Sequence, residues 1–219
     1  MRNAVIFDMD GLLIDSEPLW WQAGVEVLRT VGVDLDDSRS YETMGLRTDA
    51  ALEHWFSLFP WTGKSFQEIE QEVNSRVIQL IGEHAEPLPG VHGTIDLLSK
   101  HRIPMGVCSS SPHAVIETVL TALGLQSTIQ VVHSAESEPI GKPHPSAYLS
   151  CAKRMKVHPH RCLAFEDSVR GAAAAKAAEM KVVAVPSGRD YESTTFDFCD
   201  MRLRSLTEFD ESHLFQLFS

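Results

Sequence analysis

Short apolar runs, each followed directly by polar residues, constrain the fold of this chain more than any other feature. The clearest is Ala4–Phe7, which runs into Asp8. Similar runs occur at 103–108, 161–165 and 182–185, with a weaker one at 128–132. Unbroken runs of this length are typical of parallel strands buried on both faces. Stretches with helical spacing lie between them, at about 91–101, 112–123, 145–155 and 168–178. The alternation predicts an α/β fold, with a Rossmann-like parallel sheet covered by helices on both faces.

Residues 16–87 interrupt this alternation. Their apolar side chains recur at helical spacing, for example at Ile69, Val73, Val77 and Leu80. Ser16-Glu17-Pro18 has the features of a helix start, with a hydroxyl that can cap and a proline in the first turn. We therefore predict a helical cap domain of residues 16–87, inserted into a catalytic α/β core domain formed by residues 1–15 and 88–219.

The composition of the 219-residue chain excludes several classes of protein. A formal charge of −11 disfavours nucleic acid as a partner, because a phosphate backbone would be repelled. The longest apolar runs are a few residues, far short of the roughly 18 that span a membrane, so no membrane partner is expected. Four widely spaced cysteines without a Cys-x-x-Cys pair indicate reduced thiols in a cytoplasmic protein, although four could also form two disulfides.

The polar residues at the predicted strand ends form a candidate site. In open parallel sheets, ligands bind beyond the carboxyl ends of the strands. The residues found at these ends, or in a loop between a strand and the next helix, are Asp8, Asp10, Ser109, Ser110, Lys142, Glu166 and Asp167. Carboxylates can hold a hard cation, and hydroxyl, amide and ammonium donors can hold an anion. The set therefore indicates metal-assisted chemistry on a phosphoryl group.

Each of these signals is ambiguous when taken alone. The Asp-x-Asp-Gly pattern is common in ordinary turns, and Lys142 has the usual surroundings of a solvated loop lysine. Glu166 and Asp167 could serve only to cap the helix that follows them. On a strand Asp8 and Asp10 would face opposite sides, but a turn at Gly11 could bring both into one pocket. The joint occurrence of all of them at strand ends favours function.

Four segments, in this order, resemble the motifs of the haloacid dehalogenase superfamily. They are Val5–Glu17, Val107–Ser111, Lys142-Pro143 and Phe165–Ser168. The resemblance covers essentially the whole chain, including the helical insertion, and is strongest to the sugar-phosphate phosphatases and the β-phosphoglucomutases of the family. It implies a Mg²⁺-dependent enzyme that acts on phosphate esters.

The resemblance also implies roles for the acidic residues. Asp8 would be the nucleophile that forms an aspartyl-phosphate, and Asp10 would protonate the leaving oxygen and then activate water. Mg²⁺ would be held by Asp8, the backbone carbonyl of Asp10 and Asp167, with Glu166 either a ligand or one shell further out.

For the phosphoryl oxygens, the resemblance implies Ser109, Ser110 and Lys142. Arg47 in the cap matches a loop from which the family often reaches the substrate; the alternative is a solvated arginine at a helix start. Trp20 stands where β-phosphoglucomutase carries a histidine that takes part in acid–base work. An indole does not titrate near neutral pH, so water is the expected phosphoryl acceptor.

The resulting hypothesis is a Mg²⁺-dependent, monomeric phosphatase of small sugar or polyol phosphates. A β-phosphoglucomutase-like mutase is the first alternative. A dehalogenase is disfavoured by the paired acids, because attack on carbon needs no magnesium. A catalytically silent sugar-phosphate sensor is disfavoured because a binding module need not keep a nucleophile.

Overall fold

The computed structural model describes residues 3–188 and 190–219, and its centre is a six-stranded parallel sheet. The strands lie in the order β3-β2-β1-β4-β5-β6. Their bounds are β1 Ala4–Phe7, β2 Met105–Ser109, β3 Val131–Ser134, β4 Cys162–Glu166, β5 Lys181–Ala184 and β6 Met201–Arg202. In register, Phe7 lies opposite both Val107 and Phe165. The residues that follow β1, β2 and β4 therefore emerge side by side at one edge of the sheet.

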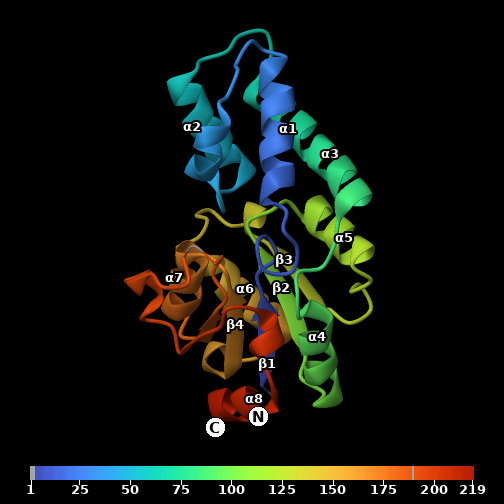
Figure 1. Ribbon diagram of the computed structural model, residues 1–219, viewed down its shortest axis with the longest axis vertical. Helices are drawn as coiled ribbons and strands as arrows, with labels where there is room; N and C mark the ends of the chain where they lie inside the picture. The colour runs from blue at the N-terminus through green and yellow to red at the C-terminus, as the bar shows by residue number, and fades with distance from the viewer. Residues whose placement is uncertain (1–2, 189) are drawn as a thin grey trace.

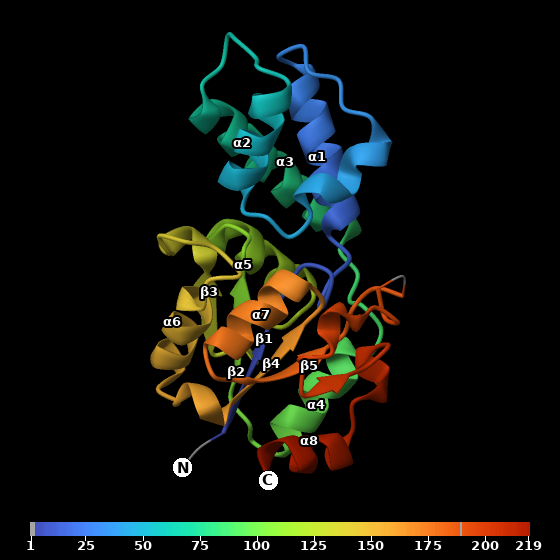
Figure 2. The same cartoon turned by 90° about the vertical axis from the view of Figure 1, so that its left-hand side faces the viewer.

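Helices cover both faces of this sheet (Figure 2). They are α4 Val91–Lys100, α5 His113–Ala122, α6 Ser146–Met155, α7 Val169–Ala177 and α8 Glu211–Phe218. Because successive strand side chains alternate between faces, Val5 and Phe7 pack in a cluster with residues of α4, α5 and α8. Ala4 and Ile6 pack in a second cluster with residues of α6 and α7. The predicted Rossmann-like architecture is confirmed.

Three further helices gather away from the sheet, at the top of Figures 1 and 2. They are α1 Glu17–Arg29, α2 Thr48–Leu58 and α3 Phe66–His84. A reciprocal capping box between Ser65 and Glu68 begins α3, whose apolar stripe packs against α1 and α5. The helical spacing predicted for this part of the chain is therefore observed, and among the described residues no helix is long and apolar enough to cross a membrane.

Some details differ from the sequence prediction. β6 and α8 were not predicted, since a two-residue strand and an eight-residue helix carry too short a pattern. The weak strand predicted at 128–132 begins instead at Val131, because the backbone N–H groups of Thr128 and Ile129 donate to the Leu125 carbonyl in a turn. The remaining elements are short 3₁₀ helices at Asp37–Thr43, Ala135–Ser137, Pro159–Arg161, Thr194–Phe196 and Leu206–Glu208.

Candidate active site

The ammonium group of Lys142 lies between two buried carboxylates at the carboxyl edge of the sheet. Its Nζ is 2.5 Å from Asp8 Oδ1 and 2.6 Å from Glu166 Oε1, and it also donates to the Cys108 carbonyl at 3.1 Å. Asp8 directly follows β1, Glu166 ends β4, and Lys142 reaches in from the loop before α6. The three residues, far apart in the chain, meet as was predicted from the positions of Asp8 and Glu166 at strand ends and of Lys142 in a loop before a helix.

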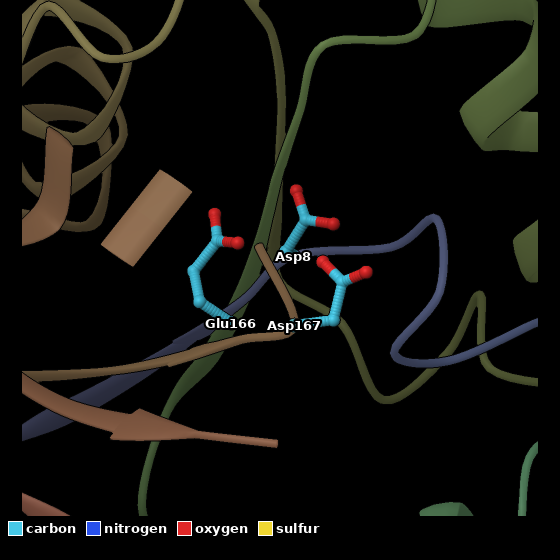
Figure 3. A group of neighbouring side chains, drawn as sticks. All are labelled: Asp8, Glu166 and Asp167. Carbon is cyan, nitrogen blue, oxygen red and sulfur yellow. The ribbon is translucent and has the colours of Figure 1, made fainter. Parts of the chain in front are cut away.

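Asp167 completes a cluster of three acids with Asp8 and Glu166 (Figure 3). One ligand oxygen from each lies within 4.8 Å of the others; among the described residues, the carboxyl group of Asp10 is not part of this cluster. A Cβ added at Gly11, where φ is +77°, would lie 2.2 Å from Asp167 Oδ2. Only a glycine permits both this backbone conformation and the close approach of the carboxylate.

Glu166 is fully buried, and both of its carboxylate oxygens accept hydrogen bonds from the protein. Oε1 accepts from Lys142 and, at 2.6 Å, from the Tyr148 hydroxyl, while Oε2 accepts from the Ser168 hydroxyl at 3.1 Å. Gly171 leaves room for this carboxylate, since a Cβ there would lie 1.9 Å from Oε1. Glu166 is thus held in place to orient the ammonium group of Lys142.

The electrostatics of the cluster suit a hard cation. Burial, with repulsion from the neighbouring carboxylates, raises the pKa of Asp8 and of Asp167 well above the usual range, although Lys142 opposes the shift. Burial disfavours the charged form of Lys142, yet Asp8 and Glu166 raise its pKa above the ordinary value. When ionised, the three acids carry more negative charge than the one ammonium group can offset, and a divalent cation with oxygen ligands would offset the remainder. Asp8 and Asp167 have the donor chemistry to hold it.

The carboxylate of Asp10 accepts four hydrogen bonds, two from each side of the cavity. Ser16 Oγ and Trp20 Nε1 donate to Oδ1 at 2.6 and 3.2 Å, from the start of α1. Ser109 Oγ and Ser111 Oγ donate to Oδ2 at 2.9 and 2.8 Å, from the end of β2. Asp10 therefore connects α1 to the sheet.

None of these four contacts with Asp10 was predicted from the sequence, which assigned Ser109 to a phosphoryl oxygen. Ser16 precedes α1, but its hydroxyl bonds Asp10 rather than capping the helix. Ser111 and Trp20 were not predicted to contact Asp10. The Ser109–Ser111 spacing was a signal for Ser111, since residues two apart at a strand end face the same side. Nothing in the local sequence pairs Trp20 with Asp10.

A cavity of about 380 Å³ opens above these groups and extends between the sheet and the three helices of residues 16–87. Its floor contains Asp8, Asp10, Ser110, Lys142 and Asp167. Reactive carboxylates, an ammonium group and a space that can enclose a ligand therefore occur together, as a site for a phosphorylated molecule requires.

Among the described residues, three predicted site residues do not line this cavity: Ser109, Glu166 and Arg47. Ser109 and Glu166 bond to Asp10 and Lys142, which do line it, whereas Arg47 has other partners. Its guanidinium group pairs with Asp49 and donates from Nη1 to the carbonyls of Glu138 and Ala135, at 2.9 and 3.3 Å. Arg47 thus ties the start of α2 to the loop after β3.

Glu17 is a cavity residue that sequence reasoning missed. It accepts a hydrogen bond from the Gly45 backbone N–H at 3.1 Å. Burial and the negative charge of Asp10 raise its pKa from 4.5 to about 7. Its position in the first turn of α1 resembled that of an ordinary helix-start acid, so the sequence carried no signal for this environment.

Comparison with known proteins agrees with this geometry. The family described as haloacid dehalogenase-like hydrolase matches residues 5–185. Hexitol phosphatase B of Escherichia coli K12 is 42% identical over 206 residues, which cover 94% of this chain and 93% of that protein. A fructose-1-phosphate phosphatase of the same organism is 35% identical over 188 residues, covering 83% of this chain and 95% of that protein. Among solved structures, a β-phosphoglucomutase from Clostridium difficile matches with a TM-score of 0.87 at 23% identity, over 100% of this chain and 97% of that one, which shows a shared fold.

Proposed function

Because this chain belongs to the haloacid dehalogenase-like hydrolase family, we propose that it is a Mg²⁺-dependent phosphatase of small sugar or polyol phosphate monoesters. The names of the curated relatives, a hexitol phosphatase and a fructose-1-phosphate phosphatase, support this substrate class. The observation that carries the proposal is Lys142, whose ammonium group lies between Asp8 and Glu166 at the floor of the cavity.

The proposed reaction has two displacements at phosphorus. A carboxylate oxygen of Asp8 attacks the phosphorus atom, the bond to the sugar oxygen breaks, and Asp10 donates a proton to the departing alkoxide. Asp10 then removes a proton from water, whose oxygen attacks the aspartyl-phosphate. Inorganic phosphate leaves, and the Asp8 carboxylate is restored. Ser16, Trp20 and Ser111 hold the carboxyl group of Asp10 at one place for both proton transfers.

We propose that Asp8, Asp167 and the backbone carbonyl of Asp10 bind Mg²⁺, and that Glu166 acts one shell further out. The second assignment is supported by the donors on both Glu166 oxygens. When bound, the cation neutralises charge, so that an anionic carboxylate can approach an anionic phosphate. Lys142, the Ser110 backbone N–H and the Ser109 hydroxyl would hold the phosphoryl oxygens, the last by turning from Asp10 to the substrate.

Residues 16–87 would act as the cap domain over a core of residues 1–15 and 88–219. In this role the cap encloses the substrate, and the Arg47 contacts with the Ala135 and Glu138 carbonyls would hold it closed. We further propose a monomer that works in the cytoplasm. All four cysteines, each within the described residues, are free thiols, in keeping with a reducing compartment.

A phosphomutase is the second candidate, because the fold matches a β-phosphoglucomutase. Trp20 favours the phosphatase. Its Nε1–H can donate to Asp10 but cannot exchange a proton with it near neutral pH. The aspartyl-phosphate would then be resolved by water rather than by a returning sugar.

Phosphorus NMR separates the two candidates. The protein is given Mg²⁺ and, in separate samples, fructose 1-phosphate, a hexitol phosphate, β-glucose 1-phosphate or glucose 6-phosphate. Inorganic phosphate should accumulate from at least one of them. Interconversion of the two glucose phosphates with little inorganic phosphate would reject the phosphatase and support the mutase.

A further inference from the structure

The cavity above the acids continues as an apolar chamber between α1 and α2. Its floor is charged. Beyond the floor the cavity is lined by Trp20, Trp21, Gly24 and Leu28 of α1 and by Leu52 and Trp55 of α2, beside polar residues such as Ser40, Thr43 and Thr48. We define the six residues of α1 and α2 as the chamber. It is continuous with the candidate active site, because the same cavity contains Asp8, Asp10 and Lys142.

The helical repeat explains the shape of the chamber. Trp20, Gly24 and Leu28 are four residues apart, so they line one face of α1. At 1.5 Å of rise per residue, this face extends about 12 Å from Trp20 to Leu28. The indole N–H of Trp20 donates a hydrogen bond to Asp10, so this face of about 12 Å begins beside the acids of the candidate active site. A phosphorylated molecule that has its phosphate on the floor and is long enough to pass Trp20 would have a second part within the chamber.

The walls offer this second part apolar surface. The N–H groups of both tryptophans are already engaged, Trp20 with Asp10 at 3.2 Å and Trp21 with Asp37 at 2.8 Å. What the two indoles present to the chamber is ring surface, and Leu28, Leu52 and Trp55 are buried apolar residues. Hydroxyl groups placed against these six residues would lose hydrogen bonds to water without gaining new ones.

Gly24 keeps the chamber open. Glycine in the middle of a helix is less stable than alanine, so a packing or functional reason is expected for its presence. Close packing is not the reason for this glycine, because no heavy atom of the neighbouring described residues would lie within 4 Å of a Cβ at this position. Any larger side chain there would project into the chamber.

We propose that this chamber binds an aryl or alkyl group on the sugar or polyol of the substrate. The substrate class is then amphipathic: a phosphate and hydroxylated carbons near the floor, where Glu17 and the Ser110 hydroxyl line the cavity, and an apolar substituent beyond them. The inference rests on the proposed phosphatase activity and specifies its substrate class.

The test compares two esters that differ only in the apolar group: methyl β-glucoside 6-phosphate and phenyl β-glucoside 6-phosphate. Burial of each additional methylene equivalent raises apparent affinity about fourfold. The phenyl ester should therefore have a kcat/KM at least about tenfold higher in the wild-type protein with Mg²⁺. Fructose 1-phosphate is assayed in parallel to test the activity itself.

Filling the chamber should abolish this preference. In Gly24→Leu the ratio of the two kcat/KM values should fall by about tenfold or more. Gly82→Leu is the matched control: Gly82 is also a helical glycine with no neighbour within 4 Å of an added Cβ among the described residues, and it lies outside the cavity lining. The control should keep the wild-type ratio.

Equal kcat/KM values for the two glucoside phosphates in the wild type would overturn the inference. If fructose 1-phosphate is hydrolysed in the same assay, the proposed phosphatase activity is still supported. An unchanged ratio in Gly24→Leu would also overturn it, since the preference would then arise elsewhere. Absence of phosphate release from both glucoside phosphates would also overturn the inference. If fructose 1-phosphate and the hexitol phosphate release none either, the proposed function is refuted as well.

Discussion

Replacing Glu17 by glutamine should stabilise the protein at pH 8 and leave its stability almost unchanged at pH 4. Glu17 lies in the cavity, where burial and the charge of Asp10 raise its pKa from 4.5 to about 7. In the unfolded chain the carboxyl group ionises near 4.5. Between these two values, unfolding releases a proton that the native state retains, so native stability falls as the pH rises.

The size of the effect follows from the shift. The pKa of Glu17 differs by about 2.5 units between the unfolded and the native state, and each unit corresponds to about 1.36 kcal/mol. The ionised carboxyl group therefore lowers the free energy of unfolding by about 3 kcal/mol above pH 7, and this loss is absent below pH 4.5. Glutamine can still accept the hydrogen bond from the Gly45 N–H, but it carries no charge to desolvate. The Glu17→Gln variant should therefore lack this pH-dependent loss of stability.

Urea unfolding followed by circular dichroism, with EDTA present to exclude metal effects, measures the difference at each pH. Glu53→Gln serves as the control, because Glu53 is an exposed glutamate on α2. The gain in Glu17→Gln over wild type should grow from near zero at pH 4 to about 3 kcal/mol at pH 8. A gain that is the same at both pH values, or a variant less stable than wild type at pH 8, would refute the raised pKa.

Three further predictions concern the acids at the floor. Asp8→Asn should keep the wild-type circular dichroism spectrum but release phosphate several orders of magnitude more slowly, because the amide is a poor nucleophile; substantial activity would remove Asp8 from that role. Ca²⁺ should not replace Mg²⁺, since its ligands lie at about 2.3–2.6 Å rather than about 2.0–2.1 Å; turnover that survives EDTA, or is equal in Ca²⁺, would contradict the metal assignment. Gly11→Ala should lower the free energy of unfolding by about 1–2 kcal/mol and activity at least tenfold, because its Cβ would meet Asp167. Gly124→Ala, at φ +69° with no described neighbour within 4 Å of an added Cβ, should lose stability through its backbone conformation alone and keep its activity; equal activity loss in both would exclude the Asp167 contact as the cause.

Much of the fold could be predicted from local patterns. β1 lies between β2 and β4 and is covered by helices on both faces, so all four residues of Ala4–Phe7 are buried and apolar. Such a run of consecutive apolar residues can be recognised in the sequence. The parallel arrangement brings the strand ends to one edge of the sheet. This is why Asp8 and Glu166, together with Lys142 in a loop between a strand and a helix, could be grouped before any distance was known. β6 and α8 were not predicted because they are too short to show a periodic pattern of apolar residues.

The contacts around Asp10, the position of Arg47 and the apolar chamber were decided by the tertiary structure alone. Ser109 and Ser111 reach Asp10 across 99 and 101 residues of chain, and Arg47 reaches Glu138 across 91. Periodicity reports which face of an element is buried, but not which side chain of another element it meets. That choice depends on how α1 and α2 pack above the sheet, and such packing sums many weak contacts between residues distant in the sequence.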